Sequence, residues 1–73
     1  MKPQEWLYFA RSEAHARAIS ARVNRSRMEK LVRPLSPKQS GQKNWIVEAV
    51  SLDYDRLLQL EWFVMGVAAG MGR

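Results

Sequence analysis

The closing stretch of the chain, from Asp53 to Gly70, most constrains what this sequence can fold into. Its spacing predicts one helix, with Asp53 as the N-cap because its carboxylate can accept a backbone N–H of the first turn. At about 100° per residue, a wide apolar stripe runs along this helix and is expected to face the core. The stripe consists of Leu57, Leu60, Phe63, Val64, Val67, Ala68 and Met71.

A second apolar stripe lies on the same predicted helix, turned by roughly 100° from the first. It consists of Leu58, Trp62, Met65 and Ala69. We expect a second copy of the chain or another protein to cover it; the alternative is that the rest of a small domain covers both stripes. Glu61 lies between the stripes with no cation three or four residues away. We expect it to pair with the first helix or, preferably, with an arginine of another chain.

The chain has 73 residues and no cysteine, so we expect one domain without disulfides or thiolate metal sites. Small domains without such links often gain stability by association. The uncharged run 62–71 is half as long as the ~20 residues that a membrane span needs, so we do not expect this helix to cross a membrane. The five apolar residues 6–10 are too few for a signal-peptide core, and we expect a cytosolic protein.

The charge is unevenly distributed. Residues 1–44 hold ten Lys/Arg and three Glu, whereas residues 45–73 hold two Arg and four Asp/Glu, which gives +7 and −2. A basic half indicates an anionic partner, either nucleic acid or an acidic protein surface. A net charge of this size is also common as an aid to solubility.

Alternation and capping signals predict three strands and a first helix before the closing helix. We expect strands at 5–10, 28–35 and 44–52, a helix from Ser12 to Asn24, and a polar loop at 36–43. Pro34 and Pro37 place the second strand at an edge, because proline cannot donate to a sheet ladder. The first helix should bury Ala16, Ile19 and Val23 and expose Arg17, Arg22 and Arg25.

This β-α-β-β-α order predicts an α+β fold: an antiparallel three-stranded sheet in the order 1-3-2 with both helices on one face. It is a ferredoxin-like arrangement that lacks the last strand. We expect the helix-facing residues to be Leu7, Phe9, Leu31, Trp45, Val47 and Ala49. The open face is expected to carry Trp6, Tyr8, Lys30, Val32, Ile46, Glu48 and Val50.

Enzyme chemistry is not indicated. His15 is the only histidine, and no nucleophile elbow, glycine-rich phosphate loop, metal-ligand cluster or cofactor motif occurs.

Two binding hypotheses remain. The first is protein binding through Leu58, Glu61, Trp62 and Met65, with attraction from the three arginines. The second is RNA or DNA binding, with bases stacked on the sheet aromatics. Its residues would be Trp6, Tyr8, Lys30 and Arg33.

The chain resembles the regulator of ribonuclease activity B family, the small protein inhibitors of RNase E. The resemblance lies in an aromatic first strand (EWLYFA), an alanine-rich helix (SEAHARAISARV), a tryptophan strand (NWIVEAVSLD) and the closing helix. The usual Gly-Gly-x-Tyr-Asp-Gly-Trp-like tail is missing, and this chain is basic where characterised members are acidic. The resemblance implies the fold and a non-enzymatic regulator.

We therefore expect a small cytosolic regulatory protein that acts by binding a protein, with a nucleic-acid-processing enzyme as the target. The size also suits a phage-type inhibitor such as an anti-CRISPR protein. The dependence of binding affinity on salt concentration distinguishes the two hypotheses. Each phosphate contact makes the affinity fall by ~0.7–0.9 log unit per log unit of salt, whereas a helix contact with a protein would be far less sensitive.

Overall fold

Three strands and three helices alternate along the chain in the computed structural model, which describes residues 3–27 and 31–71. The predicted α+β class is confirmed, with one additional short helix. The elements are β1 (Gln4–Phe9), α1 (Glu13–Arg27), β2 (Val32–Leu35), α2 (Pro37–Ser40), β3 (Ile46–Ser51) and α3 (Tyr54–Met71).

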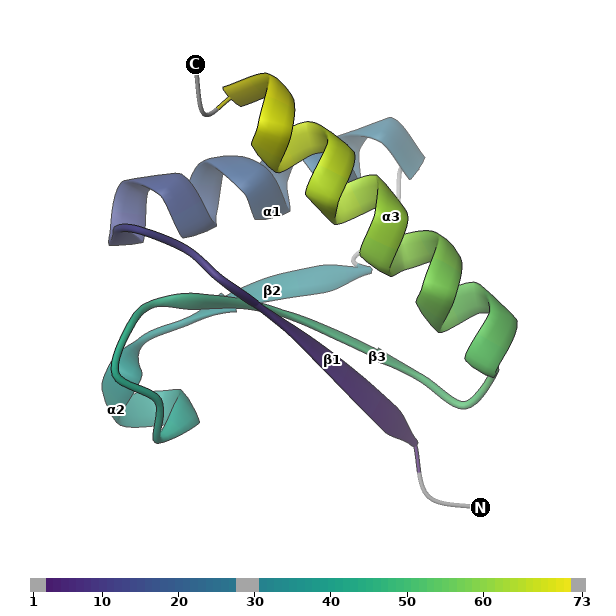
Figure 1. Ribbon diagram of the computed structural model, residues 1–73, viewed down its shortest axis with the longest axis horizontal. Helices are drawn as coiled ribbons and strands as arrows, with labels where there is room; N and C mark the ends of the chain where they lie inside the picture. The colour runs from purple at the N-terminus through teal and green to yellow at the C-terminus, as the bar shows by residue number, and fades with distance from the viewer. Residues whose placement is uncertain (1–2, 28–30, 72–73) are drawn as a thin grey trace.

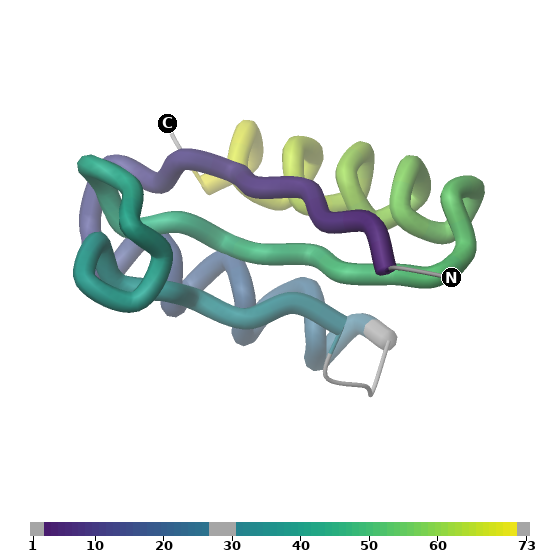
Figure 2. The backbone as a smooth tube through the Cα atoms, turned by 90° about the horizontal axis from the view of Figure 1, so that it is seen from below, coloured from purple at the N-terminus to yellow at the C-terminus, as the bar shows by residue number. Residues whose placement is uncertain are grey.

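The sheet is antiparallel in the order β1-β3-β2, as predicted (Figure 2). The crossover through α1 leaves room for β3 between the first two strands. Pro34 lies in β2, an edge strand, as its missing N–H requires. The strands are shorter than predicted: β3 begins at Ile46 rather than Asn44, and β2 begins at Val32. Residues 28–30 of the predicted second strand lie outside the described residues.

Helices α1 and α3 cover one face of the sheet, as predicted, with α1 over β2 and β3 and α3 over β1 and β3 (Figure 1). Each helix turns the stripe that its periodicity indicates toward the core, although Phe63, Val67 and Met71 of the α3 stripe are only partly buried. The buried residues of α1 include Ala16, Ile19 and Val23, and those of α3 are Leu57, Leu60, Val64 and Ala68. These side chains, together with Val47 and Ala49 of β3, form the core.

Both predicted caps are present. The His15 N–H donates to Ser12 Oγ at 3.1 Å, and the Asp55 N–H donates to Asp53 Oδ1 at 3.0 Å. These bonds satisfy amides that the first helical turn leaves without partners. The helices extend past their predicted ends, since α1 runs to Arg27 and α3 to Met71.

The predicted polar loop contains a short helix, α2, which the sequence analysis missed. Ser36 and Gln39 form a capping box: Gln39 N–H donates to Ser36 Oγ at 3.2 Å, and Ser36 N–H donates to Gln39 Oε1 at 2.9 Å. Gly41 then ends the helix with φ 74°, a left-handed conformation that glycine adopts without strain. Unlike α1 and α3, α2 lies on the open side of the sheet (Figure 1).

The predicted facing of β1 is wrong. Trp6 and Tyr8 are half-buried and pack against the core under the helices, whereas Leu7 and Phe9 lie on the open face. The register explains the difference, because Trp6 lies opposite Ala49 and Tyr8 lies opposite Val47. Directly paired residues of an antiparallel sheet point to the same face. Large rings on β1 therefore cover small residues of β3.

The predicted facing of Val32 is also wrong. Val32 lies opposite Ala49 and is buried in the core. Leu31 packs against the core as predicted, although it precedes the strand, so alternation does not extend back to it. The inward placement of Trp45, Val47 and Ala49 and the outward placement of Glu48 are confirmed.

Candidate functional site

The second stripe of α3 is exposed, as predicted, and we call Leu58, Trp62, Met65 and Ala69 the outer face of α3. Trp62 is 75% exposed, Met65 49% and Leu58 37%. Single exposed apolar residues are ordinary, but four on one side of one helix form a continuous patch. Tryptophan is also the residue type most often found at the energetic centre of protein interfaces.

The outer face points away from α1. Met71, at the end of α3, lies beside Ala18 and Ala21 of α1. Trp62 precedes Met71 by nine residues, which is about 180° around a helix. Since α1 packs beside α3 over β2 and β3, the outer face of α3 lies on the side of β1 (Figure 1).

Glu61 lies at the boundary between the outer face and the buried stripe and is half-buried. Its carboxylate makes no hydrogen bond or ion pair with the described residues. A half-buried carboxylate gains most from a charged hydrogen-bond donor. The pairing of Glu61 with an arginine of another chain stays a prediction.

The three arginines of α1, Arg17, Arg22 and Arg25, are exposed, as predicted. Two of them, Arg22 and Arg25, border a shallow depression that also includes Met71. They are placed to attract an anionic partner. Because Met71 ends α3, these two arginines lie beside the end of that helix.

Arg17 differs from the other two arginines because it has contacts within the fold. Its Nε donates to Glu13 Oε2 at 2.8 Å, one helical turn earlier. Its guanidinium lies over the ring of Trp45, 5.3 Å from the centroid. These contacts are a cation–π interaction and an i,i+4 ion pair, both of which stabilise the fold. Arg17 is therefore in part a structural residue, a role that the sequence analysis did not anticipate.

The residues of the nucleic-acid hypothesis do not share one surface. Trp6 and Tyr8 lie under the helices, with their ring centroids 6.3 Å apart, so no base can stack on them from the open face. Arg33 lies on that open face and pairs with Glu48 at 2.7 Å. Lys30 lies outside the described residues. The predicted stacking platform is therefore not formed.

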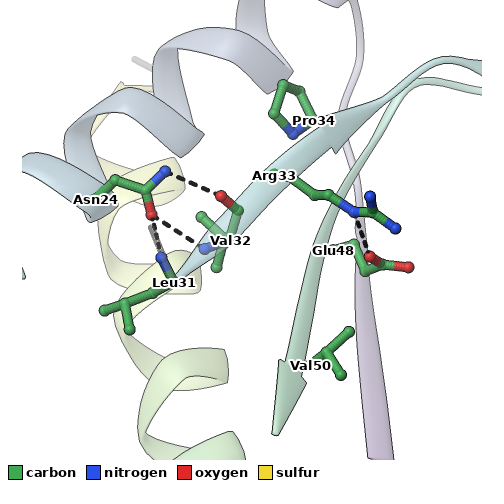
Figure 3. Close-up of a pocket in the computed structure, with 7 residues that line it drawn as sticks. All are labelled: Asn24, Leu31, Val32, Arg33, Pro34, Glu48 and Val50. Atoms are coloured by element: carbon green, nitrogen blue, oxygen red, sulfur yellow. Dashed lines mark hydrogen bonds and ion pairs between the residues drawn. The ribbon is translucent and has the colours of Figure 1, made fainter. Parts of the chain in front are cut away.

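A depression of about 540 Å³ lies along β2, between the end of α1 and the open face of the sheet (Figure 3). The polar side chains that line it form hydrogen bonds or ion pairs with other residues of the fold. Asn24 accepts the N–H groups of Leu31 and Val32 at 2.8 and 3.0 Å and donates to the Val32 carbonyl at 2.9 Å. Arg33 and Glu48 are paired with each other. Asn24 was not predicted to join these elements; its position in the last turns of α1, shortly before a strand, was the only signal in the sequence.

Chemical groups for catalysis are sparse among residues 3–27 and 31–71. His15 packs against Tyr8 with ring centroids 6.5 Å apart, and no described cluster of three His, Asp or Glu residues could hold a metal ion. Within the same ranges, no helix combines the length and the apolar character that crossing a membrane requires.

Comparison with known proteins gives no relative. No family model, no curated protein and no solved structure matches the chain. The resemblance to ribonuclease regulators stays a prediction.

Proposed function

We propose that this protein is a small non-enzymatic regulator that acts by binding protein surfaces. One observation carries the proposal: the outer face of α3 exposes Trp62, Met65 and Leu58 together, beside a half-buried Glu61. An aromatic anchor surrounded by smaller apolar groups is the composition of a protein-interface centre. A charge at its border would give the contact a defined register.

We propose a nucleic-acid-processing enzyme as the target, with the protein acting as a cytoplasmic inhibitor of the ribonuclease-regulator or phage anti-CRISPR kind. The exposed arginines of α1 would attract an acidic patch on the surface of such a target. The strand order, with α1 and α3 on one face, supports a ferredoxin-like fold that lacks the last strand.

Direct RNA or DNA binding is the alternative, and no observation favours it. Stacking on sheet aromatics needs exposed rings, and Trp6 and Tyr8 pack against the core. Only backbone attraction by the basic face of α1 would remain. Such binding would be non-specific and steeply dependent on salt.

The test is capture from a lysate of the source organism, treated or not treated with nuclease, on three immobilised proteins. These are the wild type, Trp62→Glu and the matched control Leu52→Glu. Leu52 is 67% exposed and precedes α3, so the control adds the same charge at an exposed apolar site off the outer face. Circular dichroism checks that all three are folded.

We expect the wild type and Leu52→Glu to retain the same protein, with or without nuclease, and Trp62→Glu to lose it. Equal capture by all three proteins would refute the proposal. Loss of all capture on nuclease treatment would instead favour the nucleic-acid alternative.

A further inference from the structure

The outer edge of β1 carries backbone groups that have no partner among the described residues. In that part of the chain, β1 pairs with β3 alone. The Ala10 N–H donates to the Trp45 carbonyl at 2.8 Å, which makes these two residues a hydrogen-bonded pair. Hydrogen-bonded pairs alternate along an antiparallel ladder. The backbone groups of Glu5, Leu7 and Phe9 therefore point away from β3, to the outside of the sheet.

The other edge of the sheet is closed. By the same alternation, the outward backbone groups of β2 are those of Val32 and Pro34. Asn24 binds both groups of Val32, because its Oδ1 accepts the Val32 N–H at 3.0 Å and its Nδ2 donates to the Val32 carbonyl at 2.9 Å. Pro34 has no N–H to donate. Of the two edges, β1 is therefore the one that can accept a further strand.

Helix α3 lies along the outer side of β1. Figure 2, a view onto the open face, shows α3 beside β1 on the side away from β3, and contacts join α3 to β1. Adjacent strands lie about 4.8 Å apart, so a strand added at β1 would run beneath α3. A second copy that paired its own β1 here, with its helices on the same face, would bring its α3 into the same space. The position therefore suits an extended segment that carries no helix beside it.

Three side chains of α3 would face such a strand. Glu61 is half-buried, and Leu58 and Met65 lie about one turn before and after it, on the side of α3 that is turned away from α1. Three and four helical residues correspond to about 4.5 and 6 Å along the axis. Residues on one face of a strand recur every ~6.6 Å. Alternate residues of an added strand would therefore meet these three side chains in turn.

We propose that an extended segment of a partner protein pairs with β1 as a fourth strand beneath α3, with a basic side chain on Glu61. The inference rests on the proposed function, because it describes how a partner at the outer face of α3 is held. Backbone hydrogen bonds to Glu5, Leu7 and Phe9 would give affinity for any extended segment, and side-chain contacts would select among segments.

The charges at this edge favour a basic segment. Glu61 would face the helix side of the added strand and Glu5 its open side, since Glu5 alternates with Trp6, which packs against the core. Strand β1 has no basic residue of its own. A carboxylate that the strand covers gains most from an arginine or lysine. The preferred segment thus has a basic residue with an apolar residue two positions to either side, one for Leu58 and one for Met65.

The test begins with selection on the immobilised full chain from a display library of random peptides of about nine residues. We expect the enriched peptides to share a basic residue with apolar residues two positions before and after it. An enriched peptide, synthesised with acetylated and amidated ends, is then added to the protein in solution. NMR should show that it shifts the Leu7 and Phe9 amide signals and slows the exchange of these amides with solvent.

N-methylation of alternate amides of the peptide tests the strand pairing without any change to the protein. In an added strand, one set of alternate amides points to β1 and the other points away. Methyl groups on the first set should abolish binding, because they remove the donors and block the approach to β1. Methyl groups on the second set should leave most of the affinity.

Glu61→Gln tests the basic contact, because it keeps the shape of the side chain and removes its charge. It should raise the dissociation constant of the enriched peptide by roughly ten-fold or more, and a selection repeated on this variant should lose the preference for a basic residue. Asp55→Asn is the matched control. It also removes a carboxylate from α3, at an exposed position on another side of the helix, and should leave binding unchanged.

The proposal is overturned by a library that yields no enriched peptide, by peptides that leave the Leu7 amide unshifted, or by equal effects of the two methylated sets. It is also overturned if Glu61→Gln binds as tightly as the wild type, or if the Leu7 amide is already protected in a dimer of the chain alone. The proposed function fails separately. Equal capture from lysate by the wild type and Trp62→Glu would refute that function even where peptides bind at β1, and capture through Trp62 without protection of the Leu7 amide would refute only the strand pairing.

Discussion

Replacing Asn24 by alanine tests how the end of α1 is joined to the start of β2. The Asn24 amide makes three hydrogen bonds of 2.8–3.0 Å to the backbone of Leu31 and Val32 (Figure 3). Alanine would leave two backbone N–H groups and one carbonyl without these partners. Each such bond contributes about 0.5–1.5 kcal/mol net.

The three bonds together contribute roughly 1.5–4.5 kcal/mol. The expected loss of stability is about 2–3 kcal/mol, in the lower half of this range, because Asn24 is only part-buried and water can replace some of the bonds. A domain of 73 residues has a free energy of unfolding of roughly 4–11 kcal/mol. The change would therefore remove a large part of it. The melting temperature should fall by about 10–20 °C, since 1 kcal/mol corresponds to roughly 4–8 °C in a domain of this size.

Urea unfolding followed by tryptophan fluorescence and by circular dichroism measures this loss. Asn24→Asp is the matched variant, because its carboxylate can still accept both N–H groups and loses only the bond to the Val32 carbonyl. It should be less destabilising than alanine. A midpoint for Asn24→Ala within about 0.5 kcal/mol of the wild type, at unchanged m-value, would refute the reasoning.

Two further substitutions test single features of α1. Ser20→Ala should stabilise the fold by about 0.5–1.5 kcal/mol, because Ser20 Oγ is buried without a hydrogen-bond partner and alanine is the better helix former. Urea unfolding checks this, and a loss of stability would show that the hydroxyl has a partner such as water. Arg17→Gln should destabilise by about 1 kcal/mol through its contacts with Glu13 and Trp45, whereas Arg22→Gln should stay within about 0.5 kcal/mol. Equal melting temperatures for the two variants would contradict the structural role of Arg17.

The strand order and the helix stripes could be predicted from the sequence because each depends on local signals. Ser12 and Asp53 mark helix starts, and Ile19 and Val64 belong to stripes with helical spacing. Pro34 marks an edge strand. Given two helices and three strands, a right-handed crossover then leaves few arrangements.

The facing of β1 could not be predicted, because both of its faces are apolar. Trp6 and Tyr8 alternate with Leu7 and Phe9, so alternation alone does not tell the core face from the open face. The register with β3 decides it, since Ala49 leaves room for the ring of Trp6. Register is a property of two distant segments. The same register places the rings of Trp6 and Tyr8 under the helices, away from the open face where the nucleic-acid hypothesis needed them.

The sequence at α2 contains a local signal for the start of a helix, but the polar composition of the segment led to the prediction of a loop. The Ser36-Pro37-x-Gln39 sequence has a capping residue, a proline at the first helical position and a glutamine that completes the capping box. In a polar segment that ends in glycine, these residues also suit a loop. The structural consequence is larger than the helix itself: Leu35 and Ile46, at the α2 end of the sheet, are buried although they belong to the open face.

The two apolar stripes of α3 were the most informative feature of the sequence. The structure adds which elements lie beside each stripe, which periodicity could not predict. Periodicity predicts that the stripe of Trp62 is turned away from the core, but not what lies beside it. In the fold, the neighbouring strand is β1, because α3 follows β3 and packs back over β1. The stripe of Trp62 therefore lies on the side of the helix layer that faces away from α1, where no other described element covers it.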